Sequence, residues 1–556
     1  MTALDWLIVF GLNGAVVVWG IFLGRQTKSS ADWFLAAKDL PWWIVGCSLF
    51  ATAVDSGDFV AIMGGAYQFG ISNITTWWLG LPIGWFIVSH FILIPLYRSG
   101  MFTNAEYLEY RFGPFTRAMS ALIQLQQRTN VLGNVAFSLF LTFSTLTRWS
   151  PGTTWAFVVG IAFTAAVYTA IGGLRAVAIT DSVQSILMIV ATFILFVVVW
   201  QQIGGWGGLE QRLTAQDPKL VESLMHVGGQ NTEQVPPVVL VFGFVVTLTA
   251  YCVINQSQAM RMLAARSEWD LGTAALFASV LTIAVMGCNI TLGVLGRGLF
   301  PDLEQADSLY PRLLNEYLGP GLLGVVVAGL LAGGISTYDS VGSAVAALLT
   351  RDIYARFLVR HQGDQHYLRV SRWLTVVVIG ISFGYIPFLN QGMVRFYLRL
   401  TSVAVIPLFT VYVMGVATRV HRRSGAVGLT LGILYGLTAF FGDNWGLPTL
   451  WTNSWWSYIW GILVTSGAML LTSLIIGWEP REQIATLLYS RSVPRQLTEP
   501  THAGKADQTW LETSRFASDR LKTSSKPTKQ RWYLQPVGWF VLLLLVVAYV
   551  NLVVLW

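Results

Sequence analysis

Two aspartates lie three residues apart inside an apolar stretch, in the segment SLFATAVDSGDFVAIMGG (Ser48–Gly65). Asp55 and Asp58 flank Ser56 and Gly57, and glycine weakens a helix by about 1 kcal/mol relative to alanine. A break in a membrane helix frees backbone carbonyls, which is tolerated only where the turn lines a protein cavity or an ion replaces the lost hydrogen bonds. Acids beside free carbonyls therefore predict a cation or solute site at a broken helix.

A second polar strip, AGGISTYDSVGS, interrupts another apolar stretch. Adjacent Ser336 and Thr337 are followed within one turn by Asp339. One interpretation is close helix packing through small residues, with the hydroxyls bonding back to their own helix. The other is ion ligation opposite the broken helix, because sodium is a hard cation that prefers oxygen ligands. Two neighbouring hydroxyls beside an acid favour ion ligation.

Two further ionisable residues lie within apolar stretches. Arg128 stands in the polar island IQLQQRTN, and Asp181 stands in AVAITDSVQS. Ionisable groups inside a membrane are costly and usually functional, so both are candidates for the ion or solute pathway.

The elements that position these residues are membrane helices. The chain has 556 residues, of which 54% are hydrophobic and 11% are charged, whereas soluble domains carry about 25% charged residues. Apolar runs of roughly 20 residues recur along the whole length, which predicts an all-α polytopic membrane protein with about fourteen transmembrane helices. The fourteen runs fall near residues 4–24, 40–66, 75–97, 115–147, 152–171, 176–202, 236–260, 271–299, 319–350, 370–390, 396–417, 425–441, 454–478 and 534–556.

Basic residues predict the orientation. With the N-terminus outside, 26 of the 35 Lys and Arg residues lie in inward loops and seven lie outside or at outer span ends, while Arg128 and Arg372 fall within spans. This bias predicts that both termini are outside and explains the net charge of +7 without a nucleic-acid partner. We expect a multi-pass protein of the cell membrane (plasma or inner) with a transmembrane domain at 1–478, a cytoplasmic loop at 479–533 and a final helix at 534–556.

The sequence lacks the motifs that are typical of several classes of protein. There is no Walker motif and no dinucleotide fingerprint, and the six histidines show no metal-ligand spacing. No nucleophile–base pair stands out. We therefore expect neither ATP-driven transport nor an enzyme.

Five motifs, in order along the chain, resemble those of the sodium:solute symporter family, which includes the sodium–galactose, sodium–proline and sodium–iodide symporters. They are DWFLAAKDLPWW, FTNAEYLEYRFG, YTAIGGLRAVAITDSVQ, NQSQAMRMLAARS and the long ninth-span stretch from ADSLYPRLLNEYLGP to LLTRDIY.

The resemblance implies a LeuT-type core of two inverted five-helix repeats, at about 40–202 and 236–441. It also implies one Na⁺ site, with Na⁺ as the coupling ion. Its ligands would be the carbonyls of Ala51, Val54 and Gly333 and the hydroxyls of Ser336 and Thr337. Asp181 would lie on the sodium exit path.

The solute site departs from that of the sugar symporters. Tyr251 stands where they have a stacking tyrosine, but Leu79, Leu248 and Thr282 stand near positions where they carry polar sugar contacts. Asp58 stands where the sugar symporters have a substrate-contacting residue. The solute contacts that we expect are Asp58, Tyr251, Arg128 and Asn255.

A neutral sodium site does not need both Asp55 and Asp58. Unpaired, each acid would cost several kcal/mol or be protonated. Three arrangements would compensate the extra charge: one acid pairs with Arg128, faces a cationic part of the solute, or holds a second cation. Asp55 is the candidate for the second cation. The alternative is that Arg128 snorkels to an interface and Asp58 faces water in an outer vestibule.

These observations predict sodium-coupled symport of a small organic solute by alternating access. The alternatives are a proton-coupled symporter of the same fold and a solute sensor that does not transport. Sugars, amino acids, organic acids and other small organic solutes all stay open, with sugars weakened by the missing polar contacts.

Overall fold

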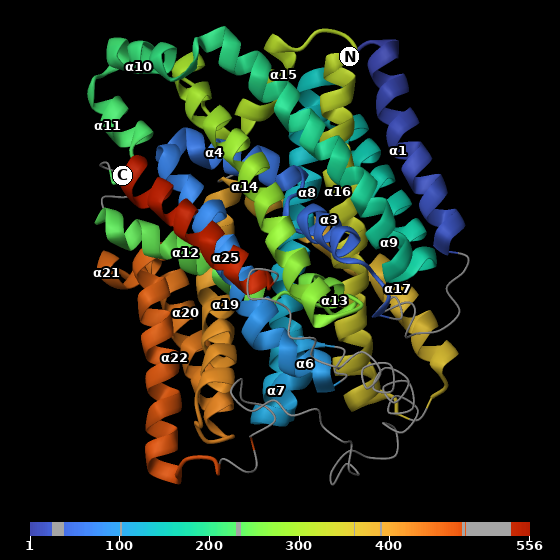
Figure 1. Cartoon of the computed structure of the whole chain (residues 1–556), viewed down its shortest axis with the longest axis vertical. Helices are drawn as coiled ribbons and strands as arrows, with labels where there is room; N and C mark the ends of the chain where they lie inside the picture. The colour runs from blue at the N-terminus through green and yellow to red at the C-terminus, as the bar shows by residue number, and fades with distance from the viewer. Residues whose placement is uncertain are drawn as a thin grey trace.

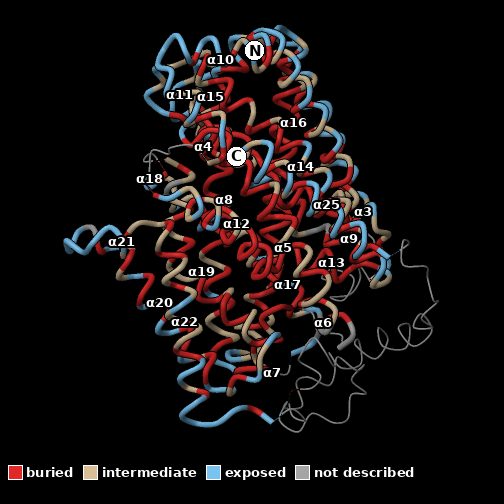
Figure 2. The backbone as a smooth tube through the Cα atoms, turned by 60° about the vertical axis from the view of Figure 1, so that its left-hand side comes forward, coloured by how far each residue is buried: buried red, intermediate tan, exposed pale blue. Residues whose placement is uncertain are grey.

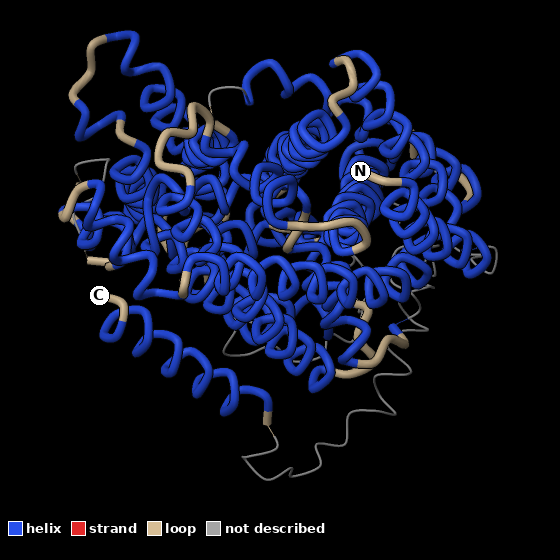
Figure 3. The backbone as a smooth tube through the Cα atoms, turned by 90° about the horizontal axis from the view of Figure 1, so that it is seen from above, coloured by secondary structure: helices blue, strands red, loops and turns tan. Residues whose placement is uncertain are grey.

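The computed structural model describes residues 1–24, 38–99, 103–228, 235–360, 362–389, 392–480, 484 and 535–556. The predicted loop at 479–533 falls almost wholly outside these residues. Within them the chain is helical, and no strand is present beyond an isolated bridge between Leu40 and Ala265 (Figure 3).

The long helices follow the apolar runs (Figure 1). They are α1 (Ala3–Gly24), α3 (Trp42–Ala53), α4 (Ser56–Phe69), α8 (Pro114–Thr147), α9 (Pro151–Ile203), α12 (Pro237–Ile254), α14 (Glu268–Leu299), α16 (Leu322–Leu348), α17 (Asp364–Ser382), α19 (Met393–Ala417), α20 (Ser424–Phe441), α22 (Ser454–Ile476) and α25 (Pro536–Tyr549). Shorter helices connect them, among them α5 (Leu81–Ile87), α7 (Asn104–Phe112), α10 (Gly205–Gln216), α11 (Lys219–Met225), α13 (Gln256–Leu263), α15 (Leu309–Tyr317) and the 3₁₀ turn η5 (Ala306–Ser308).

Every one of the fourteen predicted spans has a helical counterpart among the described residues. Twelve helices are long and apolar enough to cross a membrane, and α3 with α4 makes a further span bent by 57°. The remaining one is the shorter apolar helix Thr76–Ile92. Helix α9 contains two of the twelve, because Gly173 has a φ of 66° that interrupts it.

The span from α3 to α4 is broken at Val54 and Asp55, which have extended backbone conformations. The side chain of Asp55 accepts the backbone N–H of Asp58, and that of Asp58 accepts the N–H of Asp55. This reciprocal arrangement is a capping box, in which a helix N-terminus is satisfied by its own side chains. The two acids thus begin α4 as a new helix.

A second break separates α12 from α13 at Asn255, whose side chain accepts the N–H groups of Ser257 and Gln258. Each half of the chain therefore has a span that is broken and restarted by a capping side chain.

Helix α16 lies at the centre and packs against α9, α8 and α1. Of the most apolar part of its span, 89% is buried, against 22% for α1 and 17% for α25. Figure 2 shows the buried interior and the exposed outer helices. The central helices thus carry the polar groups, while α1 and α25 present apolar surface suited to lipid.

Candidate ion and solute site

The break in the second span leaves two carbonyls without their helical donors. In a continuous helix the N–H of Asp55 would donate to Ala51 and that of Asp58 to Val54, four residues earlier. Both N–H groups instead donate to the opposite aspartate side chain. The capping box therefore frees the carbonyls of Ala51 and Val54, the two that the sequence predicts as sodium ligands.

Helix α16 brings its hydroxyls to this break. The Oγ of Ser336 lies 3.1 Å from the carbonyl oxygen of Ala51. Gly333 lies against the start of α4, where an added Cβ would be 3.4 Å from the backbone nitrogen of Ser56. Thr337 is fully buried, and its hydroxyl has no hydrogen-bond partner. A buried, unpartnered hydroxyl is costly unless a ligand completes it.

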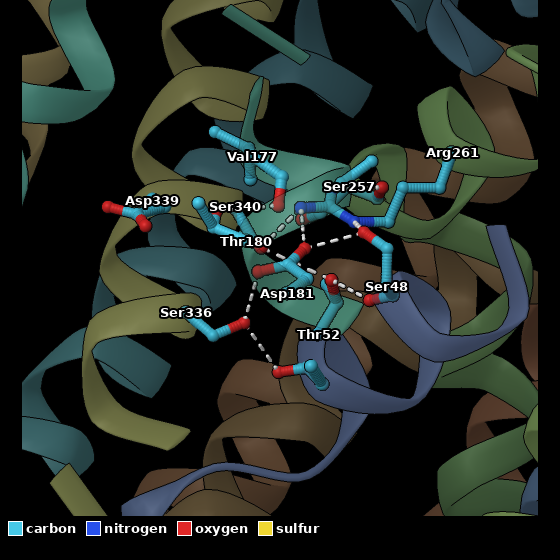
Figure 4. A network of polar contacts seen from close by, with 12 residues as sticks. Ser48, Thr52, Val177, Thr180, Asp181, Ser257, Arg261, Ser336, Asp339 and Ser340 are labelled. Atoms are coloured by element: carbon cyan, nitrogen blue, oxygen red, sulfur yellow. Dashed lines mark hydrogen bonds and ion pairs between the residues drawn. The ribbon is translucent and has the colours of Figure 1, made fainter. Parts of the chain in front are cut away.

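A buried ion pair lies beside Ser336 (Figure 4). Asp181 on α9 accepts hydrogen bonds from the hydroxyls of Ser336 at 2.6 Å and Ser48 at 2.5 Å. The guanidinium of Arg261 on α13 pairs with Asp181 at 3.2 Å and also donates to Ser48 and Ser340. The network therefore joins α3, α9, α13 and α16 at one point.

The sequence prediction did not identify this network beyond Asp181. Arg261 lies just beyond the predicted span at 236–260, and in the structure it is 1% exposed. Its position within the motif NQSQAMRMLAARS, after a break at Asn255, is the signal that could have placed it inside the protein.

The donor set suits sodium. The predicted ligands include carbonyls released from helical bonding at the break, of which that of Ala51 contacts the Ser336 hydroxyl. They also include that hydroxyl and the unpartnered Thr337 hydroxyl, and all of these ligands are oxygen atoms. Hard monovalent cations prefer such ligands, and an irregular backbone turn buried in the protein is where membrane transporters bind ions. The residues present therefore fit a Na⁺ ion.

A central cavity of about 80 Å³ adjoins the break. Asp55, Asp58 and Tyr251 line it, so three of the predicted residues come together here. The complete lining is Ala53, Asp55, Gly57, Asp58, Ala61, Ile62, Asn73, Thr76, Trp77, Val131, Asn134, Phe244, Thr247, Leu248, Tyr251, Met393, Val394, Tyr397 and Leu398.

Arg128 and Asn255 do not line the central cavity. The guanidinium of Arg128 lies 4.2 Å from the ring centre of Tyr251 and donates twice to the side chain of Gln127. Among the described residues, no ion pair joins Arg128 to either aspartate, so the expected Asp–Arg128 pair is not formed in this structure. Arg128 is buried within the bundle, contrary to the interfacial alternative.

Comparison with known proteins identifies the same family as the sequence motifs. The model of the sodium:solute symporter family matches residues 33–434. A sodium/mannose cotransporter of Bos taurus is 28% identical over 492 residues, covering 79% of each chain. A sodium/glucose cotransporter of Vibrio parahaemolyticus is 26% identical over 467 residues, covering 78% of this chain and 84% of that one.

Solved structures of two transporters have a similar fold. A substrate-bound, outward-open Na⁺-coupled sialic acid symporter superposes with a TM-score of 0.73 at 19% identity, covering 86% of this chain and 99% of that one. The nucleobase-cation-symport-1 family transporter Mhp1 gives a TM-score of 0.53 at 13% identity, covering 81% and 96%.

Proposed function

Because the chain belongs to the sodium:solute symporter family and is a sodium-coupled symporter of small solutes, we propose that its Na⁺ binds between the α3–α4 break and α16. Its fold is the LeuT type, and we assign the inverted repeats to residues 40–202 and 236–441. The ligands in this proposal are the carbonyls of Ala51, Val54 and Gly333 and the hydroxyls of Ser336 and Thr337.

The observation that carries the proposal is the contact between the Ser336 hydroxyl and the Ala51 carbonyl, beside the unpartnered Thr337 hydroxyl. A serine hydroxyl has one proton and two lone pairs. When its proton is donated to Asp181, its lone pairs are free to bind Na⁺. Asp181 is thus a positioning residue for sodium, and it is our candidate for the sodium exit path.

Transport follows from linking two parts of the protein that move relative to each other. A Na⁺ ion held by both the broken helix and α16 favours the conformation in which these elements are close together. If that conformation also binds solute more tightly, sodium raises solute affinity and the solute raises sodium affinity by the same factor. The chain is a multi-pass membrane protein, its relatives are transporters, and we propose that it performs no chemical step.

We assign the protein to the cell membrane with both termini outside. The membrane potential then adds about 2.3 kcal/mol per charge per 100 mV to an inward sodium gradient. The carbonyl of Leu555, the residue before Trp556, accepts the N–H of Val227 in the loop after α11. The N-terminus also lies toward the α10–α15 end of the molecule (Figure 1). These positions support the placement of both ends on the same side.

Sodium binding tests the ion site without knowledge of the solute. A ligand that binds only the folded protein raises its stability according to its concentration and affinity. We expect Na⁺, but not K⁺, to raise the melting temperature of the purified protein in detergent. In Thr337→Val and Ser336→Ala, the Na⁺ concentration needed to give the same rise should increase about tenfold or more, equivalent to about 1.4 kcal/mol of binding energy.

Ser343→Ala is the matched control. Ser343 is buried on the same helix, but its hydroxyl bonds back to the carbonyls of Asp339 and Ser340. It should keep the native response to sodium. An unchanged sodium response in Thr337→Val and Ser336→Ala would exclude the proposed ligands.

A further inference from the structure

We propose, on the basis of the symport function above, that the solute is a small organic cation. Its ammonium group lies beside Asp55 and Asp58, and its apolar body lies against the aromatic wall of the central cavity. Four features of the cavity lead to this assignment.

The first feature is the charge of the lining. Asp55 and Asp58 are its charged residues, and no Lys, Arg or His is among the described residues that line it. The nearby Arg128 is held by Gln127 and by the ring of Tyr251. With both acids ionised, the two carboxylates and the guanidinium leave one formal negative charge, which either a proton or a monovalent cation neutralises. Burying an unpaired carboxylate is costly, so a bound cation is favoured.

The second feature is the N-terminus of α4. In transporters of this type, the N-terminus of a broken helix can face an anionic group of the substrate. Here Asp55 and Asp58 already occupy that N-terminus through the capping box. A solute carboxylate would meet two acids instead of free N–H groups. Each aspartate accepts one backbone N–H in the box and keeps further lone pairs for an ammonium group.

The third feature is that neutral polar side chains of the cavity donate hydrogen bonds to oxygen atoms of the protein. Asn73 donates to the Ile62 carbonyl at 3.1 Å, and Thr247 to the Gly243 carbonyl at 2.7 Å. Thr76 donates to Asn73 at 3.4 Å, and Asn134 to the Asn130 carbonyl at 2.9 Å. These four bonds are not available to a sugar or another polyol, whereas the buried Nε1 of the lining residue Trp77 has no partner among the described residues and stays open to a solute.

The fourth feature is the wall itself. Trp77, Phe244, Tyr251 and Tyr397 line the cavity together with aliphatic side chains such as Leu248. Aromatic faces attract ammonium groups, and apolar walls favour a solute with an apolar body. The cavity volume of about 80 Å³ requires that body to be small.

The test compares solutes of similar shape and different charge. Native protein in proteoliposomes under an inward Na⁺ gradient is offered choline and butylamine as cations. It is also offered 3,3-dimethyl-1-butanol as the uncharged isostere of choline, proline as a zwitterion and galactose as a sugar. We expect sodium-dependent uptake of at least one cation, at an initial rate at least tenfold above that of each other solute.

Substitutions of Asp58 then test whether the cation binds beside the two acids. Asp58→Asn keeps a side-chain oxygen that can accept the Asp55 N–H, so the capping box and the carbonyls that it frees are preserved. The variant should lower cation uptake at least tenfold and leave the sodium-induced melting shift unchanged, whereas Asp58→Glu should retain part of the uptake. Asp302→Asn removes an exposed acid from the loop after α14 and should behave as the native protein.

Two results would overturn this inference while leaving sodium symport intact. One is that neither cation is taken up, whether or not proline, galactose or the uncharged isostere is carried. The other is that Asp58→Asn weakens the sodium response and not cation uptake, which would make the acid a ligand of a second Na⁺. Loss of the sodium response in native protein would instead contradict the proposed ion site.

Discussion

Single residues at the break have more than one role. From the sequence, Asp55 and Asp58 carry more charge than a neutral sodium site needs, and a pair with Arg128, a contact with a cationic part of the solute and a second cation are the alternatives for one of them. In the structure they cap α4 for each other and thereby free the carbonyls of Ala51 and Val54. Their spacing of three residues at the start of a helix is the pattern of a capping box, so this role could have been predicted. Their approach to the central cavity could not, because it depends on α12 and α19.

The pairing of Asp181 with Arg261 could not be predicted either, because the two residues are 80 positions apart and meet only when the halves of the chain pack together. Both are fully or almost fully buried. Removing one partner of such a pair leaves an uncompensated buried charge, which typically costs about 3–5 kcal/mol.

A double-mutant cycle tests this pair. We expect Asp181→Asn and Arg261→Gln each to lower the melting temperature strongly, and the double variant to lose less than the sum of the two. Arg266 and Asp270 form a comparison pair at 3.3 Å in which Arg266 is 55% exposed, so Arg266→Gln should cost about 1 kcal/mol or less. Additive losses at positions 181 and 261 would contradict a direct pair.

Whole elements meet at Asp307. This residue lies in η5, outside the spans, and its carboxylate accepts the N–H of Met393, the first residue of α19, at 3.0 Å. η5 also packs on α4 at Gly64, where an added Cβ would be 3.0 Å from the Asp307 nitrogen. Asp307 lines a second cavity of about 390 Å³, and Val394 lines both this and the central cavity. The Asp307 carboxylate therefore connects α4 with α19.

The pH dependence of stability follows from this position. Burial raises the pKa of Asp307 from 3.8 to about 6, although the bond from Met393 opposes the rise. The folded protein then holds this proton more tightly than the unfolded chain, so the contribution of Asp307 to stability falls as pH rises from about 4 to about 6.

Asp307→Asn should remove that part of the pH dependence. The variant keeps an acceptor for the Met393 N–H, and we expect it to unfold at a higher temperature than native protein at pH 7.5, by about 2 kcal/mol or less in stability. The difference should shrink as pH falls toward 4 in a series of thermal melts. A variant that is less stable than native protein at pH 7.5 would contradict this account.

At the scale of the whole molecule, the apolar runs were sufficient to predict the membrane helices. All fourteen predicted segments have helical counterparts among the described residues. A hydrophobic run indicates the length and composition of a helix but not which helices it contacts. The runs therefore could not show that α16 lies at the centre or that α25 lies at the edge. The repeat boundaries and the sodium ligands could be predicted only from the resemblance to the sodium:solute symporter family. Hydrophobic periodicity does not separate the inverted repeats, because they differ little in hydropathy.

If Na⁺ bound between the α3–α4 break and α16 drives uptake, transport must depend on sodium and on the ligands in α16. The initial rate of uptake of a carried solute into proteoliposomes is measured against external Na⁺, with and without an imposed pH gradient, for native protein and for Ser336→Ala with Thr337→Val. We expect uptake to require Na⁺, to be insensitive to the pH gradient, and to need at least tenfold more Na⁺ in the double variant. Uptake driven by the pH gradient without sodium, or an identical sodium dependence in the two proteins, would contradict the account.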